Sequence, residues 1–283
     1  MEGSQASYQI IADLLTAYTG QHLTESRRWR VTSALAGIFR EHGISNVDQL
    51  VCLLDEPQHK GLTQQVVEAL LNNETYFFRD KPTFDQLPEQ VLPELAQRRR
   101  STRRLSIWCA GCSTGQEVHS LAMVFDENAE FWRGWSIEVL GTDVSHRAIN
   151  AARSGLYSQF EVQRGLGVGE MLRHFDETRQ GWQIKDNIRA PTTFRQHNLL
   201  SDPPVHQQFD LILCRNVLLY FDRATRTQAF ARLSAALKQD GYLMLGAGET
   251  VVGQTDDFIP AEHRASIYRQ NLPASSEAIL ATG

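Results

Sequence analysis

The residues best suited to chemistry lie between Leu105 and Glu117, where an apolar run passes through a turn of small residues into a helix-forming stretch. Gly111 and Gly115 can adopt positive φ angles and lack side chains, so the backbone there can approach a ligand closely. A helix that starts after such a turn presents unpaired N–H groups beside it. The segment therefore predicts either a cradle for a nucleotide-type cofactor or an ordinary strand-to-helix turn.

The spacing of these glycines narrows the choice of cofactor. Dinucleotide-binding turns carry three glycines in the pattern G-x-G-x-x-G, which this turn lacks, so an adenosyl cofactor without a pyrophosphate is favoured over NAD or FAD. Asp143 ends the next predicted strand, 136–143, where a carboxylate can accept hydrogen bonds from both ribose hydroxyls. The alternative is that Asp143 only caps the helix that begins after Ser145.

The cysteines could form a redox or metal site. Cys109 and Cys112 form a C-x-x-C pair, but a tetrahedral zinc site needs a second pair of ligands, and neither Cys52 nor Cys214 has a neighbouring Cys or His in the sequence. Four cysteines in a chain of this length are typical of a reducing compartment. We therefore expect free thiols and no metal.

Length, composition and charge limit the class of protein. With 283 residues, 42% of them hydrophobic, the chain can bury the core of one main domain and a smaller one. No apolar run approaches the ~20 residues of a membrane span, and the polar N-terminus does not resemble a signal peptide, so we expect a cytoplasmic protein without membrane insertion. The net charge of −5 gives no general attraction to nucleic acid.

Hydrophobic periodicity divides the chain into two regions. Apolar residues at helical spacing predict helices near 8–20, 24–42, 47–54 and 62–71, which would form a small bundle. The prolines at 82, 88 and 93 favour a boundary near Lys81, giving a helical N-terminal domain, 1–80, and a second domain, 81–283.

The second region alternates strands with helices, which is typical of an α/β fold with a doubly wound, mostly parallel sheet. The predicted strands are 105–109, 136–143, 193–199, 209–214 and 242–246. Residues 157–193 interrupt the alternation and predict a small antiparallel β insert, with strands at 181–185 and 189–194. A closing edge strand is expected at 266–269, and a disordered tail from Ala274.

Two groups of arginines are candidates for binding an acidic partner. Arg27, Arg28 and Arg30 stand at the start of the second helix, where the helix dipole disfavours cations, so local stability does not explain them. Five arginines lie between Arg98 and Arg104, without the interleaved aromatic residues that stack on nucleic-acid bases. Either group could also be simply solvated.

Five further segments stand in sequence along the chain: Asn73–Asp80 (NETYFFRD), the Cys109–Glu117 turn, Gly141–Asp143, Asn198–Leu199 and Cys214–Phe221 (CRNVLLYF). Together, and in this order, they resemble the CheR-type chemoreceptor methyltransferases. The resemblance extends over roughly 9–270. It implies a Rossmann-like fold with a helical N-terminal domain and a small β insert. The implied enzyme transfers methyl groups from S-adenosylmethionine to glutamate side chains of chemoreceptors and releases S-adenosylhomocysteine.

The resemblance also implies roles for individual residues. Arg79 would pair with the methionine carboxylate of the cofactor, Glu117 would hold its amino group, and Asp143 would bind its ribose. Tyr220 would face the target carboxylate, unless its ring only fills space after the strand. The full set of implied cofactor contacts is Asn73, Thr75, Arg79, Gly111, Gly115, Glu117, Asp143, Asn198, Leu199, Arg215 and Asn216. Gln116 and Val118-His119 depart from the family pattern beside these contacts.

The implied partner is the cytoplasmic helical region of chemoreceptors, with no nucleic acid. Arg27, Arg28 and Arg30 of the helical domain would meet its acidic surface, and Arg98 would contribute to docking. In the family a longer loop in the β insert accompanies tethering to a receptor C-terminal peptide. The turn 176–181 is short, so we expect a monomer that recognises receptors without a tether. A small-molecule methyltransferase and a non-catalytic binding module remain the alternatives.

Overall fold

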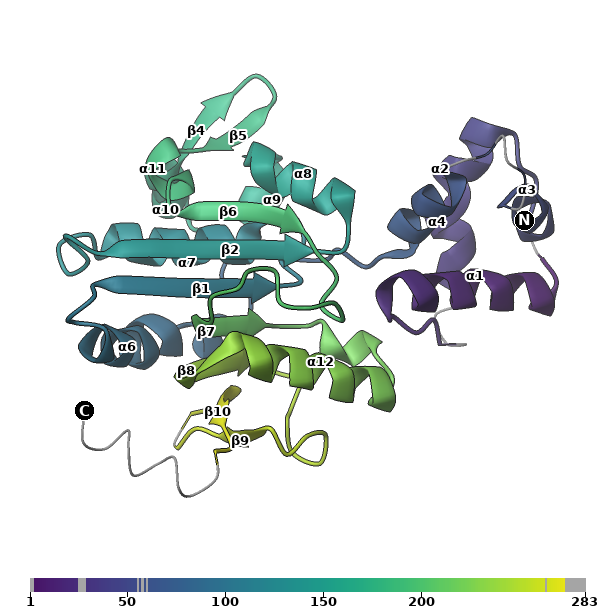
Figure 1. The fold of residues 1–283 in the computed structure, drawn as a ribbon. Helices are drawn as coiled ribbons and strands as arrows, with labels where there is room; N and C mark the ends of the chain where they lie inside the picture. The colour runs from purple at the N-terminus through teal and green to yellow at the C-terminus, as the bar shows by residue number, and fades with distance from the viewer. Residues whose placement is uncertain are drawn as a thin grey trace. The chain divides into compact units, whose positions relative to one another are not determined.

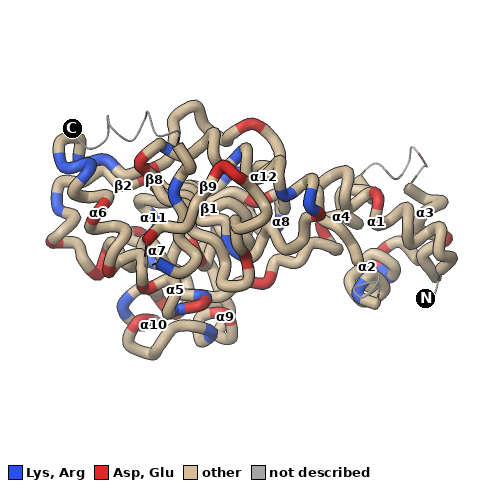
Figure 2. The backbone as a smooth tube through the Cα atoms, turned by 90° about the horizontal axis from the view of Figure 1, so that it is seen from below, with Lys and Arg blue, Asp and Glu red and all other residues tan. Residues whose placement is uncertain are grey.

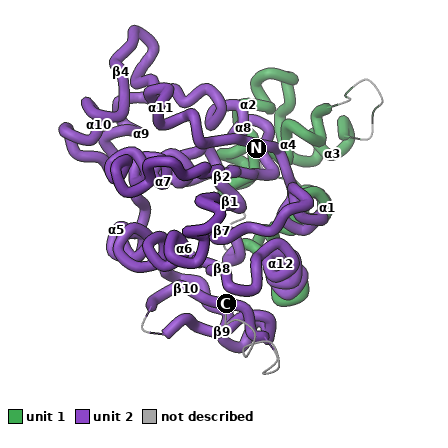
Figure 3. The backbone as a smooth tube through the Cα atoms, turned by 60° about the vertical axis from the view of Figure 1, so that its left-hand side comes forward, with its two compact units in different colours: residues 1–72, 220–225 green, residues 73–219, 226–283 purple. Residues whose placement is uncertain are grey.

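The computed structural model describes residues 3–24, 29–54, 56, 59, 61–262 and 264–272. The chain forms two compact units: a helical unit, residues 1–72 and 220–225, and a sheet unit, residues 73–219 and 226–283 (Figure 3). The division falls after Asn72 and not near Lys81. Segment 73–80 belongs with the sheet unit because Phe77 and Phe78 are buried in its hydrophobic core. The predictions for Arg27, Arg28 and the tail from Ala274 fall outside the described residues.

The helical unit contains four helices, as the periodicity predicts (Figure 1). They are α1 (Gln5–Thr19), α2 (Trp29–His42), α3 (Val47–Leu54) and α4 (Leu62–Leu70). Their apolar faces enclose one core that includes Ile11, Val31 and Leu50. The N–H of Gly20, at a φ of 75°, donates to the carbonyl of Thr16 and ends α1.

Three short helical segments open the sheet unit. They are α5 (Lys81–Phe84), a π-helical turn (Leu87–Val91) and α6 (Leu92–Arg98). Pro82, Pro88 and Pro93 each stand in the first turn of one segment, where the missing N–H leaves no hydrogen bond broken. The prolines therefore divide this stretch into short helices that pack on the sheet.

The main sheet has seven strands in the order β6-β2-β1-β7-β8-β10-β9 (Figure 1). They are β1 (Arg104–Ala110), β2 (Ser136–Asp143), β6 (Thr192–Gln196), β7 (Phe209–Cys214), β8 (Leu237–Leu245), β9 (Phe258–Pro260) and β10 (Ile267–Gln270). The pairs among β6, β2, β1, β7 and β8 are parallel, whereas β10 is antiparallel to both β8 and β9. The predicted doubly wound, mostly parallel sheet is confirmed.

The final strand differs from expectation. β10 lies between β8 and β9, so it is not an edge strand; β9 forms that edge. The three residues of β9 are too few for an alternating pattern to be recognised in the sequence.

The crossover helices lie on opposite faces of the sheet. α7 (Gln116–Glu127) connects β1 to β2, and α12 (Arg223–Ala236) connects β7 to β8, in the opposite direction along the sheet (Figures 1 and 3). Right-handed crossovers in opposite directions place their helices on opposite faces. The order reverses between β1 and β7, and ligands of open α/β sheets bind at the carboxyl edge beside such a reversal.

The predicted antiparallel insert is present, with different strand pairing. Its sheet has the order β3-β5-β4, from β3 (Leu156–Tyr157), β4 (Phe175–Thr178) and β5 (Gly181–Ile184). The strand expected at 189–194 is wrong, because those residues end the short helix α11 (Asp186–Arg189) and begin β6 of the main sheet. The sequence did not predict β4, because three of its four residues are polar and exposed.

Four further helices complete the described fold: α8 (His146–Ser154) after β2, α9 (Gln159–Gln163) and α10 (Val168–His174) within the insert, and a 3-10 turn (Leu218–Tyr220) after β7. Within the described ranges, no helix is long and apolar enough to cross a bilayer.

Arg99 fastens the end of α6 to the amino edge of the sheet. Its Nε donates to Asp210 Oδ1 at 2.6 Å, and its Nη1 donates to Asp240 Oδ2 at 2.6 Å. Hydrogen bonds from Arg99 lower the pKa of Asp240 from its usual 3.8. The folded state is therefore stabilised when this carboxyl group is ionised.

Asp240→Asn is expected to lower the free energy of unfolding at neutral pH by about 1–2 kcal/mol, because an amide accepts these charge-assisted bonds less well. Folding lowers this pKa, so the difference in free energy of unfolding between variant and wild type is largest above pH 3.8. That difference disappears as the pH falls through the pKa of Asp240 in the folded state. Urea denaturation across this pH range measures it. Glu130→Gln, at an exposed carboxylate paired with Arg133, is the matched control. A difference that does not change with pH would contradict the account.

Candidate functional site

Asp143 occupies the carboxyl end of β2 and is 7% exposed. Its Oδ2 accepts the N–H of Ser113, and its Oδ1 accepts the N–H of Ser145, both at 2.9 Å. These donors belong to the turn after β1 and to the turn after β2. Because both oxygens are bound to backbone, the carboxylate has one fixed orientation. The N-cap of α8 is Ser145, whose Oγ accepts the N–H of Ala148 at 3.0 Å.

Asn73 closes a ring of contacts around this carboxylate. Ser113 Oγ donates to the carbonyl oxygen of Asn73 at 2.6 Å, and Asn73 Nδ2 donates to Ser145 Oγ at 3.4 Å. Asn73, Ser113, Asp143 and Ser145 therefore form a closed set, called here the Asp143 ring. It joins the first residue of the sheet unit to the ends of β1 and β2.

The glycine turn beside the ring has the predicted backbone conformation. Gly111 and Gly115 have φ angles of 77° and 95°. The N–H groups of Gly111 and Cys112 both donate to the carbonyl of Thr142 at 2.8 Å. A Cβ added to Gly111 would lie 2.4 Å from Val217 Cγ2, and one added to Gly115 would lie 2.9 Å from the Ala152 Cβ. Both conformation and space therefore require glycine at the two positions.

A buried ion pair joins the start of α7 to the residue after β7. Arg215 Nη1 lies 3.0 Å from Glu117 Oε2, and Arg215 Nη2 lies 3.2 Å from Asp80 Oδ2 and donates to the Arg79 carbonyl at 2.6 Å. The Arg215 side chain is 1% exposed. Burial raises the pKa of Glu117, and the Arg215 charge opposes that effect only in part. Arg215 is thus engaged by protein groups, while Glu117 keeps acceptor capacity for a cation.

The remaining predicted cofactor residues of the sheet unit lie on three segments near the carboxyl edge of the main sheet. Arg79 Nη1 donates to the Glu74 carbonyl at 2.9 Å, next to the half-buried Thr75. The segment after β6 is attached to β2, because the N–H of His197 donates to the Asp143 carbonyl at 2.9 Å. Asn198 and the buried Leu199 follow directly. Asn216, after β7, has a left-handed φ of 60°.

Tyr220 and Arg30 belong to the helical unit. Arg30 Nη2 donates to Asn72 Oδ1 at 3.2 Å, and Asn72 Nδ2 donates to the Tyr220 hydroxyl oxygen. Tyr220 is half-buried. Its hydrogen-bonded hydroxyl argues against a ring that only fills the core.

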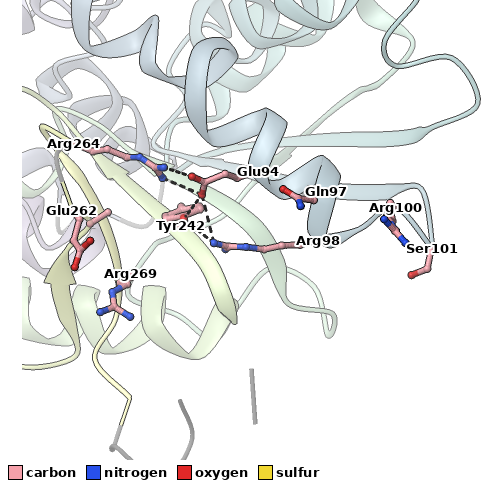
Figure 4. Close-up of a pocket in the computed structure, with 10 residues that line it drawn as sticks. Glu94, Gln97, Arg98, Arg100, Ser101, Tyr242, Glu262, Arg264 and Arg269 are labelled. Carbon is pink, nitrogen blue, oxygen red and sulfur yellow. Dashed lines mark hydrogen bonds and ion pairs between the residues drawn. The ribbon is translucent and has the colours of Figure 1, made fainter. Parts of the chain in front are cut away.

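Arg98 lies at the other edge of the sheet unit, in the wall of a hollow of about 1050 Å³ (Figure 4). Figure 2 shows the arginine-rich segment 98–104 in blue beside α6. Arg98 Nη2 donates to the Tyr242 hydroxyl at 2.9 Å and lies 3.5 Å from Glu94 Oε2. Burial raises the pKa of Glu94, but hydrogen bonds from Arg264 and Tyr242 outweigh it, so the net pKa is lowered. The predicted docking residue therefore participates in an internal cluster.

Several residues that build the site escaped the sequence predictions. Ser113, Asp80 and Glu249 act through backbone groups or through Arg215, which leave no pattern of residue types to detect. Ser145 stood before a predicted helix, and this position was the available signal.

Cys109 and Cys112 are buried free thiols, and burial raises the pKa of each well above its usual value. Among the described residues, no group of three or more His, Cys, Asp or Glu side chains could hold a metal.

Comparison with known proteins identifies the family. The family model described as "CheR methyltransferase, SAM binding domain" matches residues 73–267, so the match begins at the first residue of the sheet unit. The chain is 34% identical over 262 residues to chemotaxis protein methyltransferase 1 of Pseudomonas aeruginosa, covering 91% of this chain and 95% of that protein. It is 35% identical over 240 residues to a chemotaxis protein methyltransferase of Pseudomonas putida, and the match covers 83% of this chain and 87% of that protein.

A third relative, chemotaxis protein methyltransferase 1 of Vibrio cholerae, is 31% identical over 258 residues, covering 90% of this chain and 93% of that protein. The matched domain and these relatives define a methyltransferase that uses S-adenosylmethionine. The chain belongs to the CheR methyltransferase family.

Gly111→Ala is expected to lower the free energy of unfolding by about 2–4 kcal/mol, because a left-handed alanine and an overlap with Val217 each cost energy. It should also weaken binding of S-adenosylhomocysteine. Urea denaturation and isothermal titration calorimetry measure the two effects.

Gly169→Ala is the control, because Gly169 lies on α10 and a Cβ there would meet nothing within 4 Å. It should shift stability by less than about 1 kcal/mol. Equal denaturation midpoints for Gly111→Ala and wild type would show that the turn tolerates a side chain.

Proposed function

We propose that this protein transfers the methyl group of S-adenosylmethionine to glutamate side chains of chemoreceptors and forms glutamate methyl esters. It would thus be a protein-glutamate O-methyltransferase of sensory adaptation, acting in the cytoplasm as a monomer. The observation that carries the proposal is the Asp143 ring beside the glycine turn, in a chain of the CheR family. The relatives' names, chemotaxis protein methyltransferases, support the choice of substrate.

The cofactor would bind along the carboxyl edge of β1, β2 and β7. Each oxygen of Asp143 accepts one backbone bond in the ring, and an ionised carboxylate has further lone pairs that can accept the ribose hydroxyls. Glu117 would accept the ammonium group of the methionine moiety, and Arg79 would pair with its carboxylate. Asn198, Leu199 and Asn216 would line the adenine side and the rim, with Asn73 and Thr75 on the segment that enters the unit.

The reaction needs alignment of reactants more than acid–base catalysis. A glutamate with a pKa of about 4.3 is already an anionic nucleophile at neutral pH. When bound, S-adenosylmethionine would supply an activated methyl group: the glutamate oxygen would bond to the methyl carbon as the carbon–sulfur bond breaks, and sulfur would keep that electron pair in the neutral thioether S-adenosylhomocysteine. The protein's residues would hold oxygen, carbon and sulfur in line and remove water from the carboxylate. No proton has to be removed, so no activated His or Cys is required.

Residues of the helical unit would act on the receptor. Tyr220 would orient the target carboxylate by a hydrogen bond, and Arg30, with Arg27 and Arg28, would meet the acidic receptor surface. The hydrogen bonds from Arg30 to Asn72 and from Asn72 to Tyr220 connect these two roles. The β4–β5 connection contains only Arg179 and Gln180, which supports recognition without a receptor peptide tether. The internal contacts of Arg98 argue against a docking role for it.

The direct test is transfer of radiolabelled methyl from S-adenosylmethionine to receptor cytoplasmic fragments. We expect a base-labile label that disappears when particular receptor glutamates are replaced by glutamine, because a carboxylate is the nucleophile. Label on free metabolites but not on receptor would indicate a small-molecule methyltransferase. Receptor binding without transfer would indicate a non-catalytic module.

Tyr220→Phe is expected to lower kcat for receptor methylation about tenfold, because it removes one hydrogen bond to the reacting carboxylate. The KM for S-adenosylmethionine should change little. Steady-state kinetics with a receptor fragment measure both parameters. Tyr18→Phe, at an exposed tyrosine of the same unit, is the control. Unchanged kcat in Tyr220→Phe would remove this tyrosine from the mechanism.

A further inference from the structure

We propose that Glu249 is a positioning residue for the cofactor site, acting through the loop that follows β7. It stands after the end of β8, beyond the residues assigned to the cofactor from the sequence. The inference rests on the proposed function in one respect, namely that S-adenosylmethionine binds beside Gly111 and Asn216.

The carboxylate of Glu249 accepts four backbone N–H groups. Oε1 accepts those of Val217 at 3.0 Å and Leu219 at 3.2 Å. Oε2 accepts those of Asn216 at 2.8 Å and Gly246 at 2.9 Å. Three of the donors belong to residues 216–219, called here the β7 loop, and the fourth, Gly246, directly follows the last residue of β8. One side chain therefore fixes the path of the β7 loop relative to the neighbouring strand.

The local backbone is adapted to this contact. Asn216 has a φ of 60°, in the left-handed region that asparagine adopts more readily than most other residues with a side chain. A Cβ added to Gly246 would lie 2.8 Å from Glu249 Oε2 and 2.9 Å from the Asn216 nitrogen. Because Gly246 has no side chain, the Glu249 carboxylate can approach the backbone of the β7 loop.

The β7 loop in turn forms a wall of the glycine turn. Val217 Cγ2 lies 2.4 Å from the position that a Cβ on Gly111 would take, so Val217 packs against the bare backbone of Gly111. Glu249 binds the N–H of Val217 and the N–H of Asn216, a proposed rim residue. Through these two neighbours it would set the width and shape of the cofactor cradle without touching the cofactor.

Glu249→Gln tests this role with little change of side-chain volume. An amide oxygen can serve one pair of donors, but the NH₂ group then faces the N–H groups of the other pair. We expect S-adenosylhomocysteine to bind roughly tenfold more weakly or worse, with KM for S-adenosylmethionine raised more than kcat is lowered. Calorimetric titration gives the affinity, and circular dichroism shows that the variant is folded at the temperature used.

Asp240→Asn is the matched control for stability, because it makes the same carboxylate-to-amide change in the ion pair with Arg99 at the other edge. It should lower the free energy of unfolding and leave the affinity for S-adenosylhomocysteine unchanged. If Glu249→Gln does not fold, Glu249→Asp, which keeps the charge and shortens the side chain, is titrated instead and should also bind more weakly.

The outcomes separate the inference from the proposed function. Wild-type affinity in the folded Glu249 variant overturns the inference alone, as does an equal loss of affinity in Asp240→Asn. A wild-type protein that binds neither S-adenosylmethionine nor S-adenosylhomocysteine overturns the proposed function and this inference with it. A selective loss in the Glu249 variant supports the positioning role.

Discussion

The fixed carboxylate of Asp143 is the constraint on which the site depends. Its two oxygens bind N–H groups from two different turns, and both turns are also joined to Asn73. The ends of β1 and β2 and the start of the sheet unit therefore hold one relative position. A preorganised acceptor of this kind can bind ribose hydroxyls without first ordering a mobile side chain, which reduces the free-energy cost of binding.

The same device recurs at other strand ends of the sheet unit. Asp210 Oδ2 accepts the N–H of Ser106 at 2.9 Å and so joins the amino ends of β7 and β1. Glu249 joins the carboxyl ends of β7 and β8. Bonds from backbone to an ionised acceptor are stronger than neutral ones. Carboxylates thus reinforce the parallel sheet where its own ladder of hydrogen bonds stops, and at the carboxyl edge they lie in the region proposed for the cofactor.

The fold could be predicted largely from the sequence because its signals are local. The apolar run 209–214 is β7, and the glycines at 111 and 115 have the positive φ angles that their turn requires. Other features have no local signal. β9 is too short for a pattern, and β4 is polar, so its pairing with β5 is decided by the chain path. The return of 220–225 to the helical unit is a long-range contact that periodicity cannot show.

The layout of the candidate site was predictable where residue type and position are visible in the sequence, as for Asp143 at the end of β2 and Glu117 in the first turn of α7. It was not predictable where a side chain binds backbone, because an N–H donor is the same in almost every residue. Ser113 and Glu249 were missed for this reason, whereas the position of Ser145 before a predicted helix was an available signal for a helix cap. Arg98 shows the reverse difficulty: its charge suggested an external partner, but Tyr242 and Glu94 lie close enough to engage it.

The most direct test of the central claim is a calorimetric titration of S-adenosylhomocysteine into wild-type protein and into Asp143→Asn. The account predicts binding to a single site in the wild type and a loss of at least about tenfold in affinity in the variant, because the amide has fewer acceptor lone pairs for the ribose. Equal affinity of the two folded proteins would contradict it.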